Sequence, residues 1–206
     1  MKKNGSIQFF VVLVFIVPFV IWLGVDYYEK KVERLPILGK TREHRIESFQ
    51  LVNQDGQLKG TAQWEDKIVV TDFFFTHCPT ICPKMTNSLK SVASAFGNDP
   101  DVLINSISVD PDRDSPERLK KYKEDFSIPT KNWDLLTGDK KEIYRMARNS
   151  FMVVATDGDG GPEDFIHSES LVLIDRKKRI RGYYDGTKDS EVKQLITDIK
   201  KLKNEK

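Results

Sequence analysis

Cysteine and histidine are scarce in this 206-residue chain, which contains two cysteines and three histidines. So few cysteines exclude a small disulfide-stapled scaffold, while 39% hydrophobic residues are enough for a domain-sized core. An excess of one charge is also lacking, because Lys2 and Lys3 account for the whole formal net charge of +2. A nucleic-acid-binding domain normally carries a clear basic excess. The composition therefore predicts a globular protein that binds no nucleic acid and has few candidate chemical groups.

One long uncharged segment stands near the N-terminus, from Phe9 to Val25. Its length is close to the lower limit for a membrane-spanning helix, and a signal peptide would have a similar run. The following residues offer no clean small-x-small cleavage site, and Tyr27 and Tyr28 suit a membrane interface. We therefore expect one uncleaved transmembrane helix at residues 9–25.

The charges beside this segment predict its orientation and the layout of the chain. Lys2 and Lys3 should keep residues 1–8 in the cytoplasm and place everything after the span outside. The N-terminus lacks the arginines of a mitochondrial transit peptide, so a single-pass protein of a bacterial cell membrane with a periplasmic domain is expected. Residues 26–46 form a charged tether, and residues 47–206 form the working domain.

Strand and helix patterns alternate through this domain. Strands are expected at residues 48–52, 61–64, 68–75, 102–109, 151–154, 171–174 and 180–184, and helices at 83–96, 116–126, 140–147 and 192–202. The almost continuously apolar run 68–75 is typical of a central strand that is buried on both faces. A βαβ unit followed by a ββα unit predicts an α/β protein with a thioredoxin-like fold, here with an N-terminal hairpin and an inserted helix and strand.

Both cysteines fall where the central strand ends, in His77-Cys78-Pro79-Thr80-Ile81-Cys82-Pro83. The carboxyl end of a strand is the usual ligand-binding end of an open α/β sheet. Pro83 disfavours a helical conformation at Cys82, so we expect the helix to begin at Pro83 with both cysteines in the preceding loop. Unpaired N–H groups at a helix start stabilise thiolate, which is the metal-binding and reactive form of cysteine.

The two thiols allow a structural disulfide, a redox pair or a metal site. A disulfide that closes so small a loop gains little entropy, so a functional pair is favoured over a structural bond. Dithiol oxidoreductases usually carry the shorter C-x-x-C spacing, and the longer spacing of Cys78 and Cys82 suits chelation without excluding thiol exchange.

Three sequence blocks resemble the SCO/SenC family of copper proteins. They are residues 71–83 (TDFFFTHCPTICP), 108–116 (SVDPDRDSP) and 164–168 (DFIHS), and the similarity runs over roughly residues 45–204. The resemblance implies a thioredoxin-like domain on a single N-terminal anchor. It also implies a protein that delivers copper to the dinuclear copper centre in subunit II of cytochrome c oxidase, or reduces the cysteines of that centre.

The resemblance also implies three copper ligands, Cys78, Cys82 and His167. Two thiolates and an imidazole are soft to borderline donors that suit Cu(I) or Cu(II), although zinc would accept them too. The family often has an aspartate directly before its ligand histidine, whereas Ile166 stands there and Asp164 lies two residues earlier. A supporting role for that acid is therefore left open.

The other two histidines have simpler interpretations. His77 precedes Cys78, and in an extended strand end neighbouring side chains point to opposite faces, so His77 is not expected to be a ligand. His44 falls in the tether and is expected to be solvated. The ligand prediction for histidine therefore rests on position 167.

Two acidic groups imitate calcium loops. Asp110, Asp112 and Asp114 have the spacing of a calcium loop, but neither glycine at its sixth position nor glutamate at its twelfth is present. Asp157 and Asp159 lack a third ligand in the same way. Both stretches are predicted to be solvated loops.

Three functions are compatible with these residues. The first is a copper metallochaperone, not an enzyme, with oxidase subunit II as partner and a copper donor or dithiol reductant upstream. The second is a thiol-disulfide oxidoreductase that reduces the copper-ligand cysteines of the oxidase through Cys78 and Cys82, and it differs by not requiring His167. The third is a peroxidase on the same fold, which the family-like blocks disfavour.

Overall fold

The computed structural model describes residues 10, 12–31, 34–41, 43–97, 99–128, 131–153 and 168–205. The chain divides into two units. One unit ends at Arg34 and includes the last two residues, and the other runs from Leu35 to Asn204. All the sheet and all the candidate chemistry belong to the second unit.

The N-terminal unit contains a short π-helical stretch, Val12–Ile16, continued by helix α2, Val17–Lys31. Large apolar side chains from Phe10 to Val25 are exposed along it. Among the described residues, no helix combines the length and the apolar character needed to cross a bilayer. The transmembrane helix expected at residues 9–25 includes residues 9 and 11, which lie outside the described residues, and it stays a prediction.

The second unit is built on one mixed sheet with the strand order β2-β1-β5-β4-β3-β6-β7. The strands are β1 Gln50–Asn53, β2 Leu58–Gly60, β3 Ile68–Phe74, β4 Val102–Ser108, β5 Trp133–Thr137, β6 Ser170–Ile174 and β7 Ile180–Asp185. Strands β3, β4 and β5 are parallel, whereas the β1–β2 and β6–β7 hairpins run antiparallel to their neighbours. This arrangement confirms an α/β protein of thioredoxin type.

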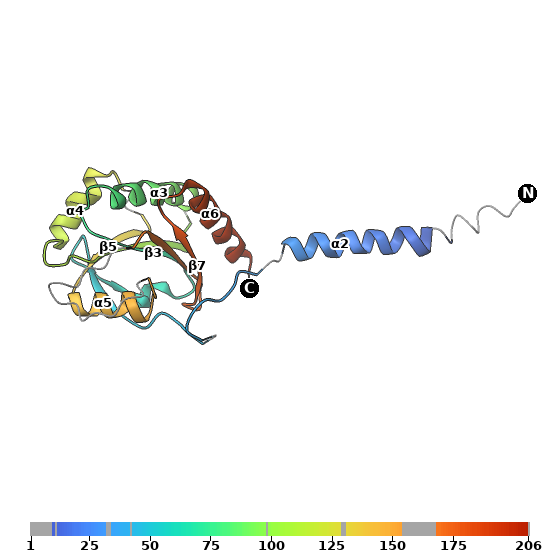
Figure 1. Ribbon diagram of the computed structural model, residues 1–206, viewed down its shortest axis with the longest axis horizontal. Coiled ribbons are helices and arrows are strands. Elements are labelled where there is room, and N and C mark those ends of the chain that lie inside the picture. The colour runs from blue at the N-terminus through green and yellow to red at the C-terminus, as the bar shows by residue number, and fades with distance from the viewer. Residues whose placement is uncertain are drawn as a thin grey trace, which may run out of the picture. The chain divides into compact units, whose positions relative to one another are not determined.

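Helices cover both faces of this sheet (Figure 1). They are α3 Ile81–Phe96, α4 Pro116–Asp125, α5 Lys140–Asn149 and α6 Asp189–Asn204. Helices α3, α4 and α6 lie along one face and α5 lies on the other. Every residue of β3 is buried, as expected for the central strand of a sheet covered on both sides.

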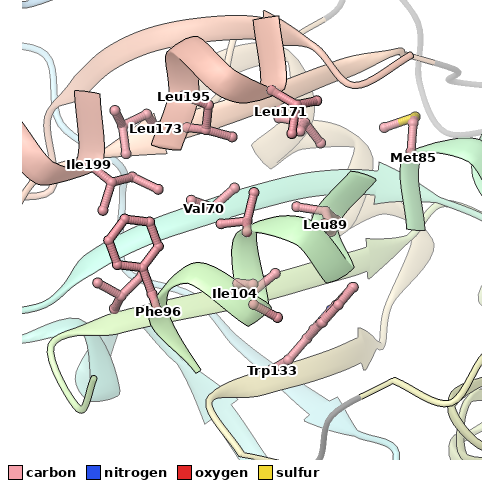
Figure 2. Close-up of a cluster of buried hydrophobic side chains, with 14 of the residues drawn as sticks. Val70, Met85, Leu89, Phe96, Ile104, Trp133, Leu171, Leu173, Leu195 and Ile199 are labelled. Carbon is pink, nitrogen blue, oxygen red and sulfur yellow. The ribbon is translucent and has the colours of Figure 1, made fainter. Parts of the chain in front are cut away.

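The alternation of side chains along β3 divides the core into two layers. Val70 and Phe74 pack with α3 and α6, whereas Val69 and Phe73 pack with α5. Figure 2 shows the first layer, in which leucine and isoleucine side chains of α3, α6 and the strands interdigitate around Val70. The carboxyl end of β3 is therefore held by packing on both sides, which gives the following loop a rigid base.

Three expected elements differ from the structure. Residues 61–64, expected as the second hairpin strand, form a 3-10 helix, and β2 lies just before them. A strand was expected at residues 151–154, but Phe151 instead buries its side chain among Trp64 and Phe73, and no strand includes residues 151–153. The inserted strand is β5, which precedes α5, so the insertion is strand–helix and not helix–strand.

The expected tether also contributes to the folded unit, which begins at Leu35 and not near residue 47. Leu38 forms a backbone bridge with Ile180 of β7, and the backbone N–H of Ile46 donates to Lys178 O at 2.8 Å. The Leu38 bridge covers part of the edge of β7, where unpaired backbone groups would otherwise be exposed, and the Ile46 contact lies on the turn between β6 and β7.

Candidate metal and thiol site

Helix α3 begins at Ile81, two residues earlier than the sequence suggested, so Cys82 and Pro83 lie inside its first turn. The prediction that both cysteines precede the helix was wrong for Cys82. The first N–H groups of a helix have no acceptor within the helix, so a proline there removes no hydrogen bond. Cys78 lies before the helix and Cys82 within it, and both are free thiols.

The sulfur of Cys78 sits over the start of α3. The backbone N–H of Cys82 donates to Cys78 Sγ at 3.3 Å, and the N–H of Cys78 donates to Phe75 O at 3.3 Å. Partial burial by itself raises the pKa of Cys78, but hydrogen bonds from the backbone of Cys82, Thr80 and Ile81 outweigh it and bring the pKa below its ordinary value. Cys78 is therefore the more readily deprotonated thiol.

Cys82 has the opposite environment. It is only 5% exposed and packs with Phe74 and Met85 in the layer of the core next to α3. Burial raises the pKa of Cys82 to about 12, with smaller contributions from Cys78 and from the carboxyl group of Asp72. The pair thus joins an accessible, easily ionised thiol to a buried thiol that holds its proton.

Asp72 is an isolated acid beneath this pair. Its side chain is 1% exposed and accepts a hydrogen bond from Ser106 Oγ at 2.5 Å, and Trp133 Nε1 donates to the same hydroxyl at 3.1 Å. Burial raises the pKa of Asp72 to about 7, against the lowering effect of the Ser106 hydrogen bond. No cation pairs with Asp72 among the ion pairs of the described residues.

The rim of the site is open to other molecules. His77, Pro79, Thr80 and Ile81 are all exposed around the half-buried Cys78. Ile81 is an unusual exposed large apolar side chain for the second unit, at 37%. A small-molecule site would normally enclose its ligand, so this exposed loop suits contact with another protein.

The two histidines in the described part of the chain, His77 and His44, contact groups other than the cysteines. His77 Nδ1 lies 3.2 Å from Thr76 Oγ1 and 3.9 Å from Asp114 Oδ1, so the ring is turned toward Asp114. His44 is not solvated as expected, because its Nε2 lies 2.8 Å from Ser150 O.

Asp114 is not in a solvated loop, contrary to what the sequence predicted. Asp114 is fully buried and accepts hydrogen bonds from Thr76 N, Thr76 Oγ1 and Ser108 Oγ. One signal could have found it: β4 is the parallel neighbour of β3, so the loops at their carboxyl ends meet. Asp110 and Asp112 remain outside the core, as predicted.

A third metal ligand is not supplied by the described part of the chain, where no group of three or more histidine, cysteine or acidic side chains forms. His167, Asp164 and the Asp157–Asp159 stretch lie outside the described residues. Strand β6 begins at Ser170 and runs antiparallel to β3, with Val172 opposite Thr71. The chain therefore enters β6 at the end of the sheet where β3 delivers Cys78.

This arrangement defines a class of protein: a thioredoxin-like domain with an exposed thiol and a buried thiol at the start of its first core helix. Two sulfur donors on one turn can hold a soft metal ion, and the same sulfurs can form a reversible disulfide. Comparison with known proteins distinguishes this class further.

A family model described as SCO1/SenC matches residues 39–204. The SCO1 protein homolog of Bacillus subtilis (strain 168) is 32% identical over 159 residues, which cover 76% of this chain and 82% of that protein. The chain belongs to the SCO1/SenC family.

Solved structures agree with this assignment. BsSco, a member of the Sco family of cytochrome c oxidase assembly proteins in which a disulfide switch was identified, matches with a TM-score of 0.71 and 30% identity, over 84% of this chain and 99% of that chain. Copper-bound ScoI of Bradyrhizobium japonicum matches with a TM-score of 0.61 and 28% identity, over 76% and 98% of the two chains.

Proposed function

We propose that this protein is a copper metallochaperone for the assembly of cytochrome c oxidase. It binds one copper ion through Cys78, Cys82 and His167 and transfers it to the dinuclear copper site of oxidase subunit II. The observation that carries the proposal is the placement of Cys78 Sγ beside the start of α3, 3.3 Å from the Cys82 nitrogen. Copper is the cargo here, and soft thiolate donors favour it over calcium or magnesium.

The exposed rim fits a transfer reaction. A copper ion held at Cys78 is reachable by the ligands of a docked partner, whereas one held only at buried Cys82 is not. Transfer then proceeds by exchange of ligands, in which a partner thiolate replaces Cys78 first. The family relationship supports an oxidase partner, since BsSco belongs to a family of cytochrome c oxidase assembly proteins.

Copper titration of the reduced, purified full chain tests this function. We expect one Cu(I) per chain in competition with a chelator, and no stoichiometric binding after oxidation to the disulfide, because metal binding needs free thiolates. Cys78→Ser and Cys82→Ser should each abolish stoichiometric Cu(I) binding, because a hydroxyl is a poor donor for a soft ion. Oxidised protein that kept its full copper load would contradict the proposal.

A thiol-disulfide reductase is the second candidate, and the contrast between the two thiols favours it. Cys78 has the exposure and lowered pKa of an attacking thiol, and Cys82 is placed as the resolving thiol. Cys78 would attack a partner disulfide, Cys82 would then displace the second partner thiol, and the protein would leave as a disulfide that an external dithiol reduces.

His167→Ala separates the two candidates. Two thiolates suffice for Cu(I), whereas Cu(II) prefers additional imidazole or oxygen donors, so the variant should keep much of its Cu(I) affinity and lose stable Cu(II) binding with its thiolate charge-transfer absorption. In cells that lack the native protein, it should not restore oxidase activity at limiting copper. Full restoration would favour the reductase, and unchanged binding of both oxidation states would remove His167 from the ligand set.

The location of the protein is a separate proposal. The exposed apolar side chains from Phe10 to Val25 suit an anchor, and Lys2 and Lys3 favour an N-terminus in the cytoplasm with the domain in the periplasm. A reporter that is active only outside the cytoplasm, fused after Lys206, should be active, and the protein should stay with membranes after a salt wash. Recovery of a shortened soluble periplasmic form would instead indicate a cleaved signal peptide.

A further inference from the structure

We propose that Asp114 is the positioning residue of the cysteine loop and acts through Thr76 to hold Cys78 against the start of α3. This inference rests on the proposed function only in taking Cys78 and Cys82 as the working thiols. Asp114 is remote from both cysteines in sequence and forms no metal-ligand cluster with them in the described residues. Its effect on the site therefore passes through the backbone between β3 and α3.

Thr76 lies in the turn that joins β3 to Cys78. Cys78 N donates to Phe75 O, which closes a turn immediately after β3 and includes Thr76 and His77. The position of Cys78 Sγ relative to Cys82 N is set by this turn on one side and by α3 on the other. A change in the backbone at Thr76 would therefore move Cys78.

Asp114 accepts two hydrogen bonds from Thr76. Thr76 N donates to Asp114 Oδ2 at 3.0 Å, and Thr76 Oγ1 donates to Asp114 Oδ1 at 2.6 Å. One carboxylate thus accepts from both hydrogen-bond donors of Thr76, which fixes its backbone and its side chain together. Because Asp114 is fully buried, water does not compete for these hydrogen bonds.

Hydrogen bonds from neighbouring elements hold Asp114 and Thr76 in place. Ser108 Oγ donates to Asp114 Oδ2 at 2.6 Å, and Ser108 ends strand β4 directly opposite Phe74 of β3. Asp114 N donates to Asp110 O at 2.9 Å, and Arg118 Nε from α4 donates to Thr76 Oγ1 at 3.1 Å. The turn is therefore tied to the sheet and to α4, which are rigid elements. The position of Cys78 should therefore be sensitive to the loss of these hydrogen bonds, although none of them involves a cysteine.

The test measures the equilibrium in which the reduced Cys78–Cys82 dithiol and one molecule of oxidised glutathione give the protein disulfide and two molecules of reduced glutathione. Thr76→Val removes the hydroxyl of Thr76 and keeps the shape of its side chain. Asp114→Asn replaces one carboxylate oxygen by an NH2 group, which faces the donors of Thr76 and Ser108. Each should lower the equilibrium constant by about tenfold, because the two sulfurs are held together less well. Thr76→Ser keeps the hydroxyl and should restore the wild-type value.

Thr71→Val is the matched control. Thr71 is a buried threonine of strand β3, which leads into the turn that contains Thr76, and its Oγ1 has no hydrogen-bond partner among the described residues. This variant should leave the equilibrium constant unchanged. An unchanged constant in folded Thr76→Val, or an equal fall in Thr71→Val, would overturn the proposal. If urea denaturation shows that Asp114→Asn is unfolded, the equilibrium constants of Thr76→Val and Ser108→Ala test the proposal in its place.

Copper binding is measured on the same variants, so that the two proposals can fail separately. Cu(I) affinity should fall by about tenfold in Thr76→Val, in parallel with the disulfide equilibrium, and recover in Thr76→Ser. If the wild-type chain binds no Cu(I), the metallochaperone function fails, whereas the glutathione measurement still decides whether Asp114 positions the loop.

Discussion

Replacing Asp72 by asparagine should stabilise the folded protein at pH 8 by up to about 4 kcal/mol, because it removes a charge that burial disfavours. Burial raises the pKa of Asp72 from 3.8 to about 7, and each pKa unit corresponds to about 1.4 kcal/mol. Between these two values the unfolded chain has released its proton and the folded chain has kept it. Raising the pH therefore favours unfolding of the wild type until the folded carboxyl group also ionises.

Urea denaturation at pH 4 and at pH 8 checks this expectation. The two proteins should have similar stability at pH 4, where Asp72 is largely neutral in the folded state, and the difference should grow through pH 7. The asparagine oxygen can still accept the Ser106 hydroxyl, but its amide needs a partner in a dry site, which reduces the gain. A constant difference at both pH values would mean that the charge of Asp72 is not the cause.

Asp72 is a buried acid that destabilises the fold and lies close to the thiols, which suggests that it has a function. Buried acids without a cation are rare in structural positions, and strongly shifted groups concentrate at functional sites. If Asp72→Asn proves more stable while oxidase assembly in cells is impaired, the charge serves the site at the expense of stability.

The elements with strong local patterns could be predicted from the sequence. The run 68–75 identified the central strand because a strand buried on both faces is almost continuously apolar. The helices expected at residues 116–126 and 140–147 correspond to α4 and α5, and the residues just before them, Ser115 and Asp139, are N-caps whose side chains accept the N–H groups of Arg118 and Glu142. These signals are local, so no long-range contact was needed to interpret them.

The errors arose where tertiary contacts override the local pattern. Strand β5 was missed because Trp133–Thr137 is short and gains its strand conformation by pairing with β4 and β1. Phe151 looked like part of a strand, but its side chain fills an aromatic cluster with Phe49 and Phe73. Apolar character predicted the burial of Phe151 and not its backbone conformation.

The candidate site was predicted unevenly for the same reason. Cys78 and Cys82 could be identified because they are the only cysteines of the chain and stand in one short segment, with three residues between them. Asp114 was missed, because an aspartate in a loop looks the same in sequence whether it is solvated or buried. Its burial depends on Thr76, which is 38 positions away and reaches it only after β3 and β4 pair.

Asp175→Asn should destabilise the folded protein by about 3–5 kcal/mol at pH 7, because it removes the carboxylate charge that pairs with the buried guanidinium of Arg181. Arg181 is 3% exposed, and its Nη1 lies 3.0 Å from Asp175 Oδ2. Burial by itself raises the pKa of Asp175, but hydrogen bonds from Arg179 and Arg181 outweigh it and hold the pKa below 3.8. This stabilisation is therefore present above about pH 4 and is lost as the pH falls through the lowered pKa, so variant and wild type should converge in acid.

The loss should also loosen the N-terminal segment of the compact unit, which gives the prediction a local measurement. Arg181 donates to Leu35 O at 2.6 Å and to Pro36 O at 3.0 Å, so the guanidinium that Asp175 holds also holds this segment on β7. Trypsin should cleave after Lys40 faster in Asp175→Asn than in the wild type, under conditions where the domain stays folded.

In Asp175→Leu/Arg181→Met, an apolar pair replaces the charges, and much of the global stability should return, since a buried ion pair contributes little more than well-packed apolar groups. Cleavage after Lys40 should remain fast in this double variant, because methionine cannot donate to the two carbonyl groups. If the double variant instead recovered protection along with stability, the segment would be held by its contacts at Leu38 and Ile46 and not by Arg181.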